Sequence, residues 1–178
     1  IFDACAEAKL YQDYGLDAII LENMHDLPYL NRRVGEEITA AMTAVAVAVR
    51  SVFTRPIGIQ ILAGANRAAL AVANAAGLDF IRAEGFVFGH LADEGYMDSD
   101  AGELLRYRKL IGAERIRIFT DIRKKHSSNA ITGDLSLSEI AKAAEFFSAD
   151  GMIITGSSTG KEASVGDLIE TRGATGLP

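Results

Sequence analysis

The sequence of 178 residues has no tryptophan and only one cysteine, Cys5. A single cysteine excludes an intramolecular disulfide and a cysteine-based metal site. Because free thiols persist in reducing compartments, we expect a cytoplasmic protein. The sequence also lacks an apolar run of about 18 residues, the length that a membrane-spanning helix needs. Its longest apolar run, residues 38–49, contains threonine and is expected to form a buried helix.

Positive charge is also scarce. The chain has 18 lysines and arginines against 24 aspartates and glutamates, which gives a formal net charge of −6. The densest basic run, residues 123–126, is too short to form the basic patch that nucleic-acid backbones require. We therefore expect no nucleic-acid partner. The length and the hydrophobic content of 49% indicate one globular domain over residues 1–178.

Short apolar segments alternate with helical patterns along the chain. Five segments rich in Ile or Phe predict strands over residues 17–23, 56–62, 79–84, 115–121 and 151–155. The patterns between them predict helices over residues 2–14, 35–50, 66–76, 100–110 and 136–147. Strands that alternate with helices pair in parallel, either in an open doubly wound sheet or in a closed barrel. The lack of a Gly-x-Gly-x-x-Gly turn after the first strand favours the barrel.

Two of the predicted helices carry specific signals at their ends. Gly77 follows the helix over residues 66–76, at a position that suits the left-handed conformation. Ser136 and Glu139 have the spacing of a capping box at the start of the last predicted helix. Both signals predict where these helices stop or begin.

Six short motifs resemble those of the BtpA family and occur in the same order, between about Tyr14 and Gly160. They are residues 22–28, 80–82, 93–95, 103–108, 121–126 and 155–160. The eukaryotic branch of the family is the most similar. The resemblance implies an α/β fold, a (βα)8 TIM-type barrel similar to the ribulose-phosphate-binding barrels. It also implies an incomplete barrel here, about units two to six plus the first helix.

Polar residues gather where the predicted strands end, and in a parallel barrel these ends converge on one mouth. The candidate site residues are Glu22, Asn23, His25, Asp26, Arg82, Glu84, Asp121, Lys125, His126, Thr155, Gly156, Ser157, Ser158, Thr159 and Gly160. They offer carboxylates, imidazoles and an amine, which is enough for general acid–base chemistry.

Asp121 ends a predicted strand, and Lys125 and His126 follow it closely. A carboxylate beside a lysine can place that lysine to stabilise a developing oxyanion or to hold a phosphate. We therefore predict that these three residues are catalytic. A salt bridge in a solvent-exposed loop is the alternative interpretation.

Glu22 and His25 are predicted to act as base and acid. Oxygen and nitrogen ligands also suit a divalent metal, but no His-x-His or carboxylate-rich spacing supports a metal site, and we predict none. Alternatively, Glu22 caps the next helix or pairs with Arg82 inside the barrel.

Arg82 and Glu84 lie two positions apart on one strand, so their side chains share a face of the sheet. Ligand binding is one interpretation, and an ion pair between the two inside the barrel is the simpler one. His90 ends a glycine-containing stretch, residues 85–90, and is expected to lie in a lid or loop.

The loop over residues 155–160 resembles a phosphate cradle, because small residues let backbone N–H groups approach an anion. It lacks the Gly-Lys-Ser/Thr of a P-loop, so nucleotide hydrolysis by that route is not expected. A simple turn is the alternative interpretation.

These patterns predict an enzyme that acts on a small phosphorylated or sugar-containing metabolite by acid–base chemistry, such as a nucleosidase or a sugar-phosphate enzyme. The ligand is expected to be small and anionic or sugar-like, and no particular cofactor is indicated. The alternative is a non-catalytic accessory factor that acts through an outer helical face such as residues 102–110. The family's name, which refers to photosystem I biogenesis, implies this second role.

The isolated 178-residue chain is expected to be poorly soluble or self-associated, with a homo-oligomer as the expected state. A barrel without three of its strands leaves two open edges, which favour pairing between copies. Size-exclusion chromatography with light scattering, followed by a thermal melt, checks this. A monodisperse monomer that melts cooperatively would contradict it.

Overall fold

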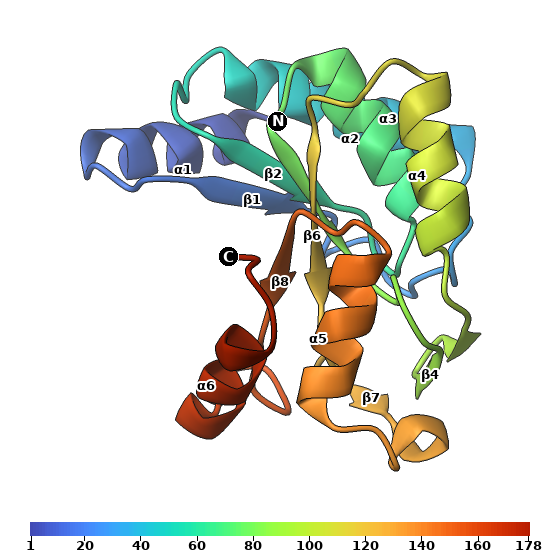
Figure 1. Ribbon diagram of the computed structural model, residues 1–178. Coiled ribbons are helices and arrows are strands. Elements are labelled where there is room, and N and C mark those ends of the chain that lie inside the picture. Colours follow the sequence, from blue (N-terminus) through green and yellow to red (C-terminus); the bar gives the residue numbers. More distant parts are fainter.

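The computed structural model describes residues 1–178 and contains a parallel sheet wrapped by helices (Figure 1). The five strands of this sheet are β1 (Ile19–Glu22), β2 (Ile57–Gln60), β3 (Phe80–Ala83), β6 (Arg117–Asp121) and β8 (Gly151–Ile153). The helices are α1 (Phe2–Asp13), α2 (Glu36–Arg50), α3 (Asn66–Ala76), α4 (Ala101–Leu110), α5 (Leu137–Phe146) and α6 (Val165–Ala174). The five predicted strands and five predicted helices are all present, with ends that differ by a few residues.

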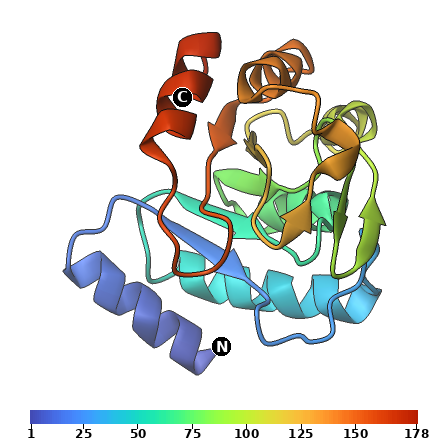
Figure 2. The same cartoon turned by 90° about the horizontal axis from the view of Figure 1, so that it is seen from below.

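The order of the strands decides between the two architectures that the sequence left open. The sheet runs β1-β2-β3-β6-β8, so each strand pairs in parallel with the next one along the chain. A doubly wound sheet reverses its strand order part of the way across, whereas a barrel does not. The chain therefore has an incomplete TIM-type (βα) barrel fold. Figure 2 shows the helices following one another round the outside of the curved sheet.

The two faces of the sheet differ because side chains alternate along each strand. Isoleucines of the outer face, among them Ile59, Ile81 and Ile118, are fully buried in the core between sheet and helices. On the inner face, Phe80 and Phe119 pack with ring centroids 5.2 Å apart. On β1, β2, β3 and β6, the inner positions nearest the carboxyl ends are polar, namely Glu22, Gln60, Arg82 and Asp121. The hydrophobic core therefore lies outside the barrel wall, and the polar side chains face the barrel mouth.

The helix ends follow the signals in the sequence. Gly77 ends α3 with φ 69° in the left-handed region. Ser136 caps α5 through a complete capping box, in which its side chain accepts from the Glu139 N–H and the Glu139 carboxylate accepts from the Ser136 N–H. No helix is long and apolar enough to cross a membrane.

Three short strands form a second, antiparallel sheet that the sequence did not reveal. They are β4 (His90–Ala92), β5 (Gly95–Met97) and β7 (Ser127–Ser128), in the order β5-β4-β7. A 3-10 turn (Ala130–Thr132) and helix α6 were also not predicted. His90, expected in a lid or loop, instead lies buried in β4. Strands of two or three residues are too short for a period-two pattern to mark them.

The small sheet ties together the loops beyond β3 and β6. Strand β4 pairs with β5 within the β3–α4 loop and with β7 from the β6–α5 loop. This pairing fixes two of the loops that form the barrel mouth. In the five-stranded sheet, the edge strand β8 is contacted by the end of the chain. The Met152 N–H donates to the Pro178 carbonyl at 3.0 Å, so the chain returns to β8 after α6.

Candidate functional site

A cavity of about 440 Å³ lies at the carboxyl ends of the parallel strands. Its lining comes from the ends of β1, β2 and β3 and from the segments that follow β1, β2, β3, β4, β6 and β8. The lining residues are Glu22, Met24, Leu27, Pro28, Tyr29, Gln60, Leu62, Ala63, Arg82, Glu84, Asp93, Glu94, Lys124, Lys125, His126 and Thr159. This is the mouth at which the sequence predicted a site.

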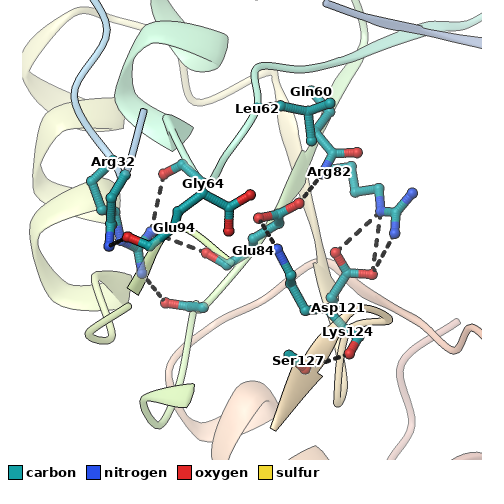
Figure 3. A network of polar contacts seen from close by, with 12 residues as sticks. Arg32, Gln60, Leu62, Gly64, Arg82, Glu84, Glu94, Asp121, Lys124 and Ser127 are labelled. Carbon is teal, nitrogen blue, oxygen red and sulfur yellow. Dashed lines mark hydrogen bonds and ion pairs between the residues drawn. The ribbon is translucent and has the colours of Figure 1, made fainter. Parts of the chain in front are cut away.

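Arg82 lies at the centre of the first of two ionic groups in the cavity wall (Figure 3). Its Nη2 lies 2.9 Å from Asp121 Oδ1, and its Nε donates to both oxygens of the same carboxylate. Its Nη1 lies 3.5 Å from Glu22 Oε1. Because the Asp121 side chain is only 1% exposed, it reaches the cavity through Arg82 alone.

Glu84 lies at the centre of the second ionic group. Its Oε1 accepts from Gln60 Nε2 at 2.5 Å, and its Oε2 lies 2.9 Å from Lys124 Nζ. Both charged side chains are nearly buried. Figure 3 shows Glu84 between Gln60 and Lys124, with the Arg82–Asp121 pair beside them.

Burial and ion pairing shift the pKa values of Asp121 and Arg82 in opposite directions. Burial raises the pKa of Asp121 to about 6, although the Arg82 guanidinium acts to lower it. Burial acts to lower the pKa of Arg82, but Asp121 and Glu22 raise it overall. Burial, with Lys124 nearby, lowers the pKa of His90. Arg82 therefore stays charged, and His90 favours its neutral form.

The pairings expected from sequence spacing are replaced by others. Asp121 pairs with Arg82 and not with Lys125, and Glu84 pairs with Lys124 and not with Arg82. The alternative in which Glu22 pairs with Arg82 is the one observed. Spacing along one chain segment did not reveal these partners because they come from different strands or from the segments that follow those strands.

Glu22, the last residue of β1, and the candidate residues that follow it in the β1–α2 loop differ in their relation to the cavity. Glu22 lines the cavity, whereas His25 and Asp26 are exposed and do not line it. The buried Asn23 accepts from the Leu62 N–H at 2.7 Å and donates to Asp26, which ties the β1 and β2 loops together. The structure thus separates Glu22 from His25, which we expected to act together.

The loop over residues 155–160 meets the cavity only at Thr159. The Thr159 N–H lies 3.3 Å from His126 Nε2, and the Thr159 hydroxyl lies 3.0 Å from the same nitrogen. A Cβ at Gly156 would collide with the Lys161 carbonyl, and Gly160 has φ 79°. Local turn geometry therefore explains both glycines without an anion.

Several residues that shape the cavity were absent from the sequence predictions. Lys124, Gln60 and Glu94 line it. Arg32, in the β1–α2 loop, donates to the Gly64 and Glu84 carbonyls and pairs with Asp100 at 2.9 Å, so it fastens three loops together. The alternation along β2 places Gln60 on the inner face, and this signal could have found it. No pattern distinguishes Lys124 from its neighbours or marks Arg32.

No group of three or more His, Cys, Asp or Glu side chains is arranged to hold a metal ion.

Burial raises the pKa of Asp100 to about 6, although Arg32 and Asn66 act to lower it. Asp100 belongs to the loop fastening around Arg32 and does not line the main cavity.

A sequential parallel sheet with a polar cavity at its carboxyl edge defines a TIM-type barrel protein with its candidate site at the barrel mouth. The sequence profile of the BtpA family matches residues 1–176. The chain therefore belongs to the BtpA family.

Relatives of this family occur in distant organisms. An uncharacterized mitochondrial protein of Caenorhabditis elegans is 52% identical over 92% of the chain and 61% of its own length. An uncharacterized protein of Archaeoglobus fulgidus is 39% identical over 93% of the chain and 65% of its own length. The photosystem I biogenesis protein BtpA of Synechocystis is 33% identical over 97% of the chain and 60% of its own length. The chain thus spans less than two thirds of each of these relatives.

Proposed function

We propose that the barrel mouth binds a small sugar-containing metabolite and performs acid–base chemistry on it. One observation carries this proposal: two cations, Arg82 and Lys124, line the cavity, and each is held by a buried carboxylate. Removing paired charges from water is costly, and a hydrophobic replacement of a buried pair is often more stable. We infer that this network is retained for what it does to a ligand.

The roles follow from which atoms face the cavity. Glu22 is the most exposed carboxylate of the network, with 25% of its side chain accessible, and it is the proposed acid–base group. Arg82 and Lys124 stabilise charge that develops on the ligand, and Asp121 and Glu84 position them. Lys125 and His126 also line the cavity and are further candidates for proton transfer. Asp121 acts here as a positioning residue because Arg82 separates it from the cavity.

A thermal-shift screen of the full-length protein tests the site. The ligands are nucleosides, free sugars, sugar phosphates, inorganic phosphate and divalent metals. A ligand that binds only the folded state raises the melting temperature. Turnover of a stabilising ligand should fall by about 10²- to 10⁴-fold in Glu22→Gln, the range expected for loss of a general acid or base.

The matched control is Glu114→Gln, the same substitution on an exposed glutamate between α4 and β6, at the opposite end of the sheet. It should keep full turnover. Unchanged turnover in Glu22→Gln would contradict the acid–base role. The absence of any stabilising ligand would contradict the proposed site.

An accessory role in assembly is the second candidate, and the observation that favours it is the name of the Synechocystis relative. Such a role would use an outer surface such as that of α4 (Ala101–Leu110), where Leu110 is exposed. Substitutions on α4 would then remove function while those in the cavity would not. The cytoplasmic location stays a prediction, and the name of the worm relative places that protein in mitochondria.

A further inference from the structure

Two unpartnered acceptor atoms belong to residues that line the cavity. Gln60 is 2% exposed, and its Oε1 is buried without a hydrogen-bond partner. Glu94 Oε2 is likewise buried and unpartnered. Buried polar atoms without partners cost free energy and are rare in native proteins. Both atoms accept hydrogen bonds, so a group that satisfies them must donate.

The orientation of the Gln60 amide follows from its neighbour. Glu84 Oε2 forms an ion pair with Lys124 Nζ at 2.9 Å, and the oxygens of a carboxylate in an ion pair only accept hydrogen bonds. The Gln60 nitrogen must therefore face Glu84 Oε1, as observed at 2.5 Å. The amide oxygen is left as the free acceptor, and reversing the amide would place two acceptors against each other.

The charges of the cavity argue against an anionic ligand at this wall. Four carboxylates and three cationic side chains line it, and the Asp121 carboxylate lies directly behind Arg82. Arg82 and Lys124 are already paired with carboxylates. The Thr159 N–H, from the loop expected to cradle phosphate, donates to His126. A phosphate would therefore find few free donors and several like charges.

The lining of the cavity also includes apolar residues, in contrast to these polar acceptors. Met24, Leu27, Pro28 and Tyr29, all from the β1–α2 loop, line the same cavity. Met24 and Leu27 are 56% and 69% exposed, so they offer uncovered apolar surface to a ligand. A ligand pocket that combines apolar surface with a few placed acceptors suits a molecule with one apolar part and one part rich in hydroxyl groups.

We propose that the ligand is a neutral glycoside of the nucleoside type. Its sugar hydroxyls donate to Gln60 Oε1 and Glu94 Oε2, and its flat ring packs against the apolar residues of the β1–α2 loop. This inference rests on the proposed function and narrows its ligand class, because it excludes phosphate recognition by this wall of the mouth.

The test is calorimetric titration of the full-length protein with adenosine, uridine, ribose 5-phosphate and inorganic phosphate. We expect the nucleosides to bind and phosphate alone not to bind. Glu94→Met and Gln60→Met each remove one acceptor and should weaken nucleoside binding about tenfold or more, the loss expected for one hydrogen bond to a buried or charged acceptor. Glu114→Gln, far from the cavity, should bind as the unaltered protein does.

The possible failures are distinguishable. If ribose 5-phosphate or phosphate binds, the nucleosides do not, and Lys125→Met weakens that binding, the glycoside inference is overturned while the proposed site stands. If nucleosides bind Glu94→Met and Gln60→Met as tightly as they bind the unaltered protein, the assigned acceptors are wrong. If none of these compounds binds, the glycoside inference fails. If no ligand of the thermal-shift screen stabilises the protein either, the proposed function fails with it.

Discussion

Replacing Arg82 with methionine is expected to lower the free energy of unfolding by about 3–5 kcal/mol, the cost of leaving a buried charge without its partner. Asp121, whose side chain is 1% exposed, would lose its cationic partner, and Glu22 would lose its neighbour at 3.5 Å. Urea denaturation of the full-length protein measures the change.

Two further variants show whether the charge network causes this loss. Arg106→Met, at an exposed arginine that bonds only to the Gly102 carbonyl one turn away, should change stability by no more than about 0.5 kcal/mol. The double variant Arg82→Met, Asp121→Leu removes both buried charges and should recover most of the stability. Recovered stability without ligand binding would indicate that the pair serves the site. If Arg82→Met is as stable as Arg106→Met, the network carries no such charge penalty.

Phe53→Ala is expected to destabilise the protein by about 3–5 kcal/mol, because it leaves a cavity in a close-packed core. Phe53 is fully buried in the core between the helices and the outer face of the sheet. The matched control is Phe146→Ala on α5, where the ring is 84% exposed and a change within about 0.5 kcal/mol is expected. Thermal and urea unfolding compare the two variants. Equal stability would contradict the placement of Phe53 in the core.

The sequence by itself determined the five parallel strands and five of the six α-helices. Isoleucine-rich segments such as residues 57–60 form strands because they are buried against helices, and the alternation of strands with helices requires a parallel sheet. Gly77 and Ser136 mark helix ends through local chemistry alone, namely a left-handed residue and a capping side chain. The motifs that resemble the BtpA family predicted the barrel, and the order of the strands confirmed it.

The tertiary structure alone decided which charges meet. Arg82 and Asp121 lie 39 positions apart, and Glu84 and Lys124 lie 40 apart, so no spacing within one segment could pair them. The register between β3 and β6 brings these pairs together across the sheet. The short strands of the second sheet could not be predicted from the sequence, because two or three residues cannot display a period-two pattern. Local hydrophobic periodicity fixes which segments become strands and helices, whereas the partners of the polar side chains depend on how distant strands are aligned.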